Sequence, residues 1–219
     1  MGQVLASPDE RTSSRRLAHA DVKRQYDIDK KHPLGSGHFG VVYKCTRRAT
    51  GEAFAIKAIK RASVHRPERL LTEIAVLRRV AHPHIIDVVD VFEAEEKVYI
   101  VTELCAGGEL FDRIIEKTRT PEGRYCEQDA ALLVRQVVSA VEYCHTLDPP
   151  ICHRDLKPDN FLFRTSAPDS PLVVIDFGLS QATNVQMHTA VGTPYYMAPE
   201  VLRAARAQGP PQALFFPRG

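Results

Sequence analysis

Hydrophobic and polar positions in the first part of the chain predict neighbouring antiparallel strands followed by a helix. Residues 41–44 and 53–59 are rich in apolar and β-branched side chains, and the turn signal Thr50-Gly51 separates them. Pro67 suits the first turn of a helix, and the apolar residues after it recur at helical spacing: Leu70, Ile74 and Leu77.

Two more apolar stretches extend this sheet. Residues 85–92 and 97–104 flank an acidic turn at residues 93–96, as expected of a strand pair. Together with the preceding strands and helix, they predict a small antiparallel sheet that carries one helix.

The rest of the chain is predicted to be mainly helical. It turns helical after Gly107-Gly108, and residues 127–147 form the strongest predicted helix, although Cys126 is a poor residue for its N-cap. Short apolar runs at residues 161–163 and 172–175 flank a Ser/Pro/Asp loop. One face of the long helix is apolar: Leu133, Val137, Ala140, Val141 and Cys144.

The composition is that of a soluble globular protein with a real core. The 219 residues are 44% hydrophobic and 26% charged. The net charge of +2 is too small to indicate nucleic acid or an anionic membrane as the main partner. Because no apolar run approaches the length needed to cross a bilayer, no transmembrane segment is expected.

The cysteines indicate a reducing, cytoplasmic environment. The chain has five cysteines, no CxxC pair and no signal peptide before them, so a disulfide framework is not expected. Gly2 follows the initiator Met and invites N-myristoylation, but Ala6 stands where Ser or Thr is usual. Membrane attachment through Gly2 therefore has only partial support.

The first chemical signal is the glycine-rich string GSGHFGVV. Gly35, Gly37 and Gly40 fall between two predicted strands, where backbone amides can close over phosphates without side-chain obstruction. A second strand follows the string, which argues against the dinucleotide-binding use of such a motif, since that use requires a helix. An ordinary glycine turn remains the alternative on this string alone.

The second signal is Lys57, which lies in an apolar strand. A buried ammonium group is costly without a partner, and Glu73 lies on the following helix, facing the sheet if Ile74 and Leu77 mark its buried side. An ion pair between them would orient the lysine towards phosphates. Two exposed surface charges are the alternative.

The third signal, HRDLKPDN at residues 153–160, is specific. Six fixed identities occur by chance on the order of once in 10^8 starting positions. The set supplies a carboxylate to orient a hydroxyl, a lysine to balance charge on a moving phosphoryl group, and an amide oxygen for a metal ion.

The fourth signal, Asp176-Phe177-Gly178, follows an apolar strand that would present the carboxylate at its end. Oxygen ligands from Asp176 and Asn160 suit Mg2+, whereas the scattered His and Cys residues lack the spacing of a zinc site. A lone Asp-Phe-Gly is usually just a turn, so this interpretation depends on the neighbouring HRDLKPDN motif.

The motifs occur in the order of the eukaryotic protein kinase family, and GTPYYMAPE follows at residues 192–200. The sequence resembles that family over about residues 26–202. GGELFDRI at residues 107–114, APDSPLVVIDFGLS and GTPYYMAPEVL look most like the calcium-dependent and calmodulin-dependent kinases. Lys157 together with Thr193 follows the serine/threonine pattern of the family and not the tyrosine pattern.

The resemblance implies an α+β, bilobal fold. A polar, disordered leader is expected at residues 1–25, a small antiparallel-sheet lobe with one helix at 26–104, a partial and mainly helical larger lobe at 105–202, and a divergent tail at 203–219.

The resemblance also implies roles for individual residues. Asp155 is the expected catalytic base, Lys157 steadies the γ-phosphate of ATP, and Lys57, paired with Glu73, contacts the α- and β-phosphates. Asn160 and Asp176 are the expected Mg2+ ligands. The expected ATP-binding residues, with Thr102 as gatekeeper, are Leu34, Gly35, Gly37, Gly40, Val42, Ala55, Lys57 and Leu162, with the backbone of Glu103 and Cys105 as the hinge.

The expected partners are protein substrates with Ser or Thr, bound at Glu109, Asp159 and Thr193. The two carboxylates match positions that select basic residues upstream of the target, although both can equally be solvated surface charges. Arg154 precedes the catalytic Asp, and in the family an arginine at this position often binds a phosphate in the activation loop. Candidate phosphate acceptors are Ser180, Thr183 and Thr189.

After Leu202 the chain departs from the family pattern. We expect exposed apolar surface and poor stability as a result. No EF-hand pattern occurs, so a calcium-sensing region would belong to a longer form. Three hypotheses follow: an ATP-dependent serine/threonine kinase, a catalytically inactive nucleotide-binding or interaction fragment, and a more distant NAD-type enzyme.

Overall fold

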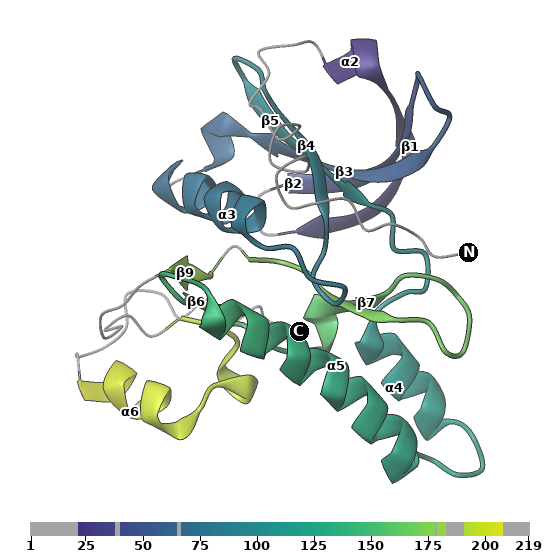
Figure 1. The fold of residues 1–219 in the computed structure, drawn as a ribbon, viewed down its shortest axis with the longest axis vertical. Helices are drawn as coiled ribbons and strands as arrows, with labels where there is room; N and C mark the ends of the chain where they lie inside the picture. The colour runs from purple at the N-terminus through teal and green to yellow at the C-terminus, as the bar shows by residue number, and fades with distance from the viewer. Residues whose placement is uncertain (1–21, 38–39, 65–66, 178, 183–190, 208–219) are drawn as a thin grey trace.

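A five-stranded antiparallel sheet forms the upper lobe in the computed structural model, which describes residues 22–37, 40–64, 67–177, 179–182 and 191–207 (Figure 1). Its strand order is β1-β2-β3-β5-β4. Helix α3 (Pro67–Arg79) packs beside the sheet, as the spacing of its apolar residues predicts. The strands are β1 (Tyr26–Gly37), β2 (Gly40–Arg47), β3 (Ala53–Lys60), β4 (Val88–Glu93) and β5 (Lys97–Glu103).

Two details of the upper lobe differ from the sequence prediction. Residues 85–87 do not extend β4, because Ile85 forms a parallel bridge with Val174 of the lower lobe and Ile86 donates a backbone hydrogen bond to the Val174 carbonyl. Residues Val22–Gln25, expected in the leader, form the short helix α2 with Val22 buried. The folded lobe therefore begins at least four residues before Tyr26.

The lower lobe is mainly helical, as predicted. Its longest helix is α5 (Glu127–Thr146), which follows α4 (Leu110–Thr118), and α6 (Pro199–Ala207) lies near the end of the described chain (Figure 1). Short strands flank the motif residues: β6 (Ile151–Cys152) pairs with β9 (Gln181–Ala182), and β7 (Phe161–Phe163) pairs with β8 (Leu172–Val174). This lobe also contains two short 3-10 helices, η2 (Pro158–Asn160) and η3 (Pro194–Tyr196), and a third, η1 (Arg61–Ser63), follows β3 in the upper lobe.

Helix α5 is both a core element and an exposed apolar surface. Ala140 and Cys144 are buried, and Cys126 caps the helix after all, since its Sγ accepts a hydrogen bond from the Asp129 amide at 3.3 Å. On another face, Val134 and Val138 are more than half exposed. This agrees with the expected exposed apolar surface, while the expected poor stability stays a prediction.

The α+β, two-lobed architecture is thus the predicted one. Among the helices that the structure describes, none combines the length and the apolar character needed to cross a membrane.

Candidate functional site

The glycine-rich string lies at the turn between β1 and β2. Gly37 pairs with Gly40 and Gly35 with Val42. A Cβ atom on Gly35 would meet no atom within 4 Å, so the backbone there faces open space. A Cβ atom on Gly40 would lie 2.2 Å from the Ala58 carbonyl oxygen, so that glycine is required by the close approach of β3.

Lys57 and Glu73 form the ion pair that the sequence predicts. Lys57 Nζ donates a hydrogen bond to Glu73 Oε1 at 2.9 Å, and the side chains are only 17% and 3% exposed. The alternative of two surface charges is therefore wrong. Burial acts to lower the pKa of Lys57, but the negative charges of Glu73 and Asp176 outweigh it and raise the pKa. The ammonium group is consequently held charged between two acidic residues.

The expected adenine site lies where β5 leaves the sheet. Ala55 pairs with Thr102, and the Thr102 hydroxyl donates to the Glu103 carbonyl at 3.2 Å. Leu162 forms an antiparallel bridge with Glu109, which follows the hinge along the chain. Leu34 is more than half exposed at the open edge of the sheet.

Cys105 continues the hinge beyond Glu103. Burial, followed by the nearby charge of Glu103, raises the pKa of the Cys105 thiol to about 12. The thiol is therefore protonated near neutral pH, and Cys105 contributes its backbone and an uncharged side chain to this segment.

Three neighbouring residues hold the Asp155 carboxylate: Lys157 and Asn160 from the same loop, and Thr193 from a later segment. Its Oδ1 accepts hydrogen bonds from Thr193 N at 2.8 Å and from Thr193 Oγ1 at 2.7 Å. Asn160 Nδ2 donates to Asp155 Oδ2 at 3.2 Å, and Lys157 Nζ lies 3.6 Å from that same oxygen. Lys157 also donates to Thr193 Oγ1 at 2.9 Å. A carboxylate, a lysine and a hydroxyl-bearing residue thus meet at one point.

His153 orients this loop, a role that sequence reasoning missed. Its Nδ1 accepts from the Asp155 amide at 3.3 Å, which leaves Nε2 to donate to the Ile175 carbonyl at 3.1 Å. Its ring lies edge-on to Phe177, with the centroids 4.8 Å apart. Burial lowers the pKa of His153, in keeping with a neutral ring that accepts at one nitrogen and donates at the other. The HRD spacing was the available signal.

Asp176 and Asn160 can supply the oxygen ligands of a cation. Asp176 follows β8 with a φ of 58°, a left-handed conformation that turns the chain sharply after the strand. Asn160 is buried and its side-chain Nδ2 donates hydrogen bonds to Asp155. The side-chain amide oxygen of Asn160 is therefore the atom that can bind a cation. This oxygen set fits Mg2+. In the described part of the chain, no three His, Cys, Asp or Glu side chains cluster as a metal site.

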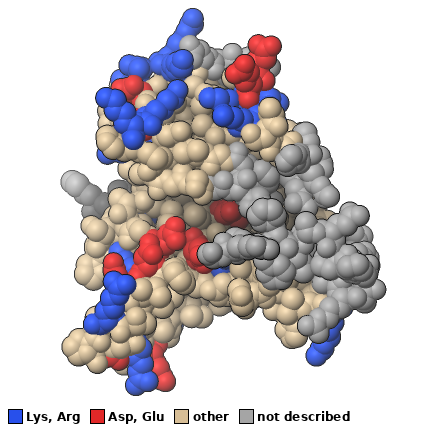
Figure 2. Space-filling view, turned by 180° about the vertical axis from the view of Figure 1, so that it is seen from behind, with Lys and Arg blue, Asp and Glu red and all other residues tan. Residues whose placement is uncertain are grey.

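Three carboxylates lie near one another beside the catalytic loop. The pKa of Glu109 is raised by burial and then by the charges of Asp112 and Asp159, while Lys157 acts in the opposite direction. Asp112 was missed by sequence reasoning, although it follows Glu109 by one helical turn. In Figure 2, acidic side chains gather below a small lobe whose upper end is rich in Lys and Arg. Such a set favours basic ligands.

The candidate phosphate acceptors fare differently. Ser180 is buried and its hydroxyl donates to the Phe177 carbonyl, which does not favour its modification in this conformation. Thr183 and Thr189 lie outside the described residues. Arg154, with a φ of 71°, donates to Gln181 Oε1 at 2.7 Å.

Comparison with known proteins gives one consistent family. The family model described as "Protein kinase domain" matches residues 28–215, which extends past the end of the resemblance at residue 202. The chain is 42% identical over 185 residues to calcium-dependent protein kinase 5 of Plasmodium berghei (strain Anka), covering 84% of the chain and 32% of that protein. It is 46% identical over 179 residues to human calcium/calmodulin-dependent protein kinase type IV, covering 81% and 36%.

A plant relative gives a similar picture. Identity to calcium-dependent protein kinase 7 of Arabidopsis thaliana is 41% over 196 residues, covering 87% of the chain and 35% of that protein. The chain spans about a third of the length of the curated relatives it matches.

Proposed function

Because the chain belongs to the protein kinase family, we propose that it transfers the γ-phosphoryl group of ATP to Ser and Thr hydroxyl groups of protein substrates. The single observation that carries the proposal is the meeting of Asp155, Lys157 and Thr193 at one point, where the Thr193 hydroxyl is hydrogen-bonded to both other side chains and Lys157 lies 3.6 Å from the Asp155 carboxylate. This arrangement positions a base and a cation where a hydroxyl group can attack a phosphoryl group.

The proposed reaction uses Asp155 as the base. The substrate hydroxyl oxygen forms a bond to the γ-phosphorus, the bond between that phosphorus and the bridging oxygen of ATP breaks, and ADP leaves. The hydroxyl proton passes to the Asp155 carboxylate. Lys157 is 3.6 Å from Asp155 and offsets negative charge on the transferred group.

ATP would bind between the two lobes. We assign the α- and β-phosphates to Lys57, whose ammonium group is already fixed by Glu73, and the adenine ring to the hinge backbone at Glu103 and Cys105. Asn160 and Asp176 would hold Mg2+. When bound, the ion neutralises phosphate charge.

The substrate class follows from the three carboxylates. Glu109, Asp112 and Asp159 together create a negative potential beside the catalytic loop; the pKa of Glu109 is raised first by burial and then by the charges of the other two. We therefore assign to this chain substrates with Arg upstream of the target Ser or Thr. Arginine is favoured over lysine because its guanidinium group can pair with two carboxylate oxygens at once.

Regulation and location extend the proposal. The names of the similar proteins contain "calcium-dependent" and "calmodulin-dependent". We assign calcium control to a regulatory region of a longer form of the protein, and place the chain in the cytoplasm, with attachment to membranes through Gly2 as a variant of that location. Phosphate on Thr183 or Thr189 would be read by Arg154.

The proposal is tested by transfer of labelled phosphate from ATP with Mg2+ to a Ser peptide that carries Arg upstream. Asp155→Asn should lower the rate about 10^2–10^4-fold, while ATP binding persists. Asp169→Asn, which alters an exposed acid in the loop before β8, is the matched control and should leave the rate unchanged. Mg2+-dependent ATP binding without transfer would instead support an inactive nucleotide-binding module.

A further inference from the structure

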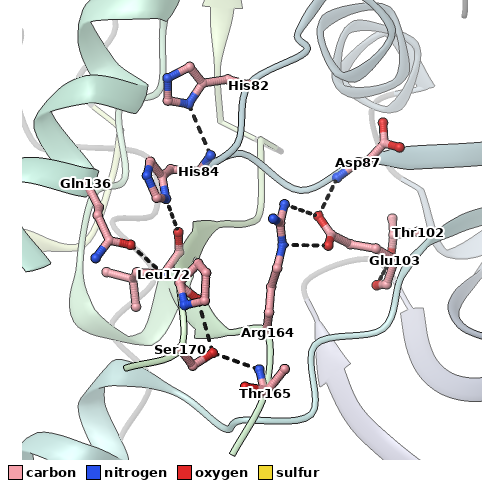
Figure 3. Close-up of polar contacts among 11 residues, drawn as sticks. His82, His84, Asp87, Thr102, Glu103, Gln136, Arg164, Thr165, Ser170 and Leu172 are labelled. Carbon is pink, nitrogen blue, oxygen red and sulfur yellow. Dashed lines mark hydrogen bonds and ion pairs between the residues drawn. The ribbon is translucent and has the colours of Figure 1, made fainter. Parts of the chain in front are cut away.

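Arg164 lies outside the residues assigned to ATP, metal and substrate, yet it holds both ends of the hinge. It follows β7 and lies beside the end of β5 (Figure 3). Its side chain binds the Glu103 carboxylate at the start of the hinge, and its backbone carbonyl accepts a hydrogen bond from the Ala106 amide at 2.9 Å at the end. One residue of the lower lobe thus spans the segment that joins the two lobes.

The ion pair has two contacts between its partners. Arg164 Nε lies 2.8 Å from Glu103 Oε2, and Arg164 Nη2 donates to Glu103 Oε1 at 3.1 Å. The two side chains are 32% and 23% exposed, so water screens them less than an ordinary surface pair. The Nη2 contact is a hydrogen bond, whereas Nε is close to the carboxylate without hydrogen-bond geometry, so one hydrogen bond and the attraction of opposite charges hold the pair.

The Glu103 carboxylate also binds the upper lobe. Its Oε1 accepts from the Asp87 amide at 3.1 Å, while the Glu103 amide donates to the Asp87 carbonyl at 3.1 Å (Figure 3). The two residues therefore close a reciprocal pair of hydrogen bonds. Glu103 thus links Arg164 to residue 87.

The segment before Asp87 is tied to β8 as well. Val174 donates to the His84 carbonyl at 2.9 Å, Ile86 donates to the Val174 carbonyl at 3.0 Å, and His84 Nδ1 contacts the Leu172 carbonyl at 2.9 Å. The hinge is thus flanked by a continuous strip of hydrogen bonds that runs from β8 through residues 84–87 to Glu103 and Arg164.

We propose that Arg164 is a positioning residue whose side chain, by holding the Glu103 carboxylate, fixes the hinge backbone for adenine, while its backbone carbonyl holds Ala106. The inference rests on the proposed ATP site. A hinge held in its binding geometry before ATP arrives loses less freedom on binding, so the arginine acts on nucleotide affinity and not on the chemical step. A merely structural ion pair would affect stability without this selectivity.

The test compares Arg164→Ala and Arg164→Lys with Arg61→Ala in the full chain. Arg61 is the matched control because its Nη2 binds Glu93 Oε2 at 2.7 Å elsewhere in the upper lobe. We expect Arg164→Ala to raise the Kd for ATP with Mg2+, and KM for ATP, about 3–10-fold with kcat changed less than about twofold. Arg164→Lys should fall between, because an ammonium group lacks the planar fork. Arg61→Ala should change none of these.

Amide hydrogen exchange gives a second readout that does not require ATP. Arg164→Ala should speed exchange at residues 103–107 and at residue 87 while leaving exchange in α5 unchanged. Because both residues belong to one ion pair, exchange in the double variant Glu103→Gln/Arg164→Ala should be no faster than in the faster-exchanging of the two single variants. Equal behaviour of the Arg164→Ala and Arg61→Ala chains, or uniform acceleration of exchange, would overturn the inference. If the unaltered chain binds no ATP, the proposed function fails and the local exchange pattern alone decides the role of Arg164.

Discussion

Removal of the charge on Glu73 should destabilise the chain strongly, although the substitution changes only one group of the side chain. Glu73→Gln keeps the size of the side chain and an oxygen to accept from Lys57, but the 2.9 Å ion pair becomes a hydrogen bond to a neutral amide. Glu73 is 3% exposed, and its Oε2 is buried without a hydrogen-bond partner among the described residues. The new amide nitrogen would therefore be buried where no acceptor is at hand.

The magnitude follows from the burial of the pair. Breaking a buried ion pair costs about 3–5 kcal/mol because one charge is left stranded. Lys57 is 17% exposed and retains the nearby charge of Asp176, so we expect a smaller loss of about 2–4 kcal/mol in the free energy of unfolding. Lys57→Met/Glu73→Gln strands no lysine charge, and its loss should be smaller than the sum of the two single losses by at least about 1 kcal/mol.

The assay is urea unfolding followed by far-UV circular dichroism, since the chain has no Trp. Glu93→Gln is the control, because its partner Arg61 is 44% exposed and the pair should be worth less than about 1 kcal/mol. The reasoning is refuted if Glu73→Gln lies within about 0.5 kcal/mol of the unaltered chain, or if the two single losses simply add.

Three further outcomes follow from the site and its surroundings. Because the pKa of Glu109 is raised, its carboxylate becomes protonated and loses its charge at a higher pH than an ordinary glutamate. In peptide kinetics, KM for an Arg-containing peptide should therefore rise as pH falls through that pKa. Glu109→Gln should show a higher KM that does not change with pH in this range. With a thiol pKa of about 12, Cys105 should react with iodoacetamide at pH 8 about 10^3 times more slowly than an ordinary thiol, and mass spectrometry should find Cys126, which is exposed, labelled first; equal labelling would contradict this. A Cβ on Gly107 would lie 2.0 Å from a backbone oxygen, so Gly107→Ala should cost about 1–3 kcal/mol in urea unfolding, more than Gly123→Ala, whose Cβ meets open space although its φ is positive; the opposite order would contradict it.

The residues that the sequence identified best are those whose chemistry restricts their identity. Lys57 and Glu73 could be paired in advance because helical spacing placed Glu73 on the buried side of α3, and the structure brings them to 2.9 Å. Asp155, Lys157 and Asn160 lie within one short motif, so their proximity required no knowledge of the fold.

Other features that the sequence missed depend on contacts between distant segments. Arg164 and Glu103 are 61 positions apart, and nothing local to either residue predicts that they meet. The late start of β4 has the same origin, because Ile86 gives its hydrogen bond to Val174 of the other lobe instead of to a neighbouring strand. Local patterns predict elements, whereas such pairings arise only once the lobes have packed together.

The most direct test of the proposed kinase activity is the initial rate of phosphate transfer from labelled ATP, with Mg2+, to three peptides that are identical except for Ser, Thr or Tyr at the target position. The account predicts label on the Ser and Thr peptides, little on the Tyr peptide, and a rate about 10^2–10^4-fold lower in the Asp155→Asn chain. Absence of transfer from a folded chain that binds ATP, or an unchanged rate in the Asp155→Asn chain, would contradict it.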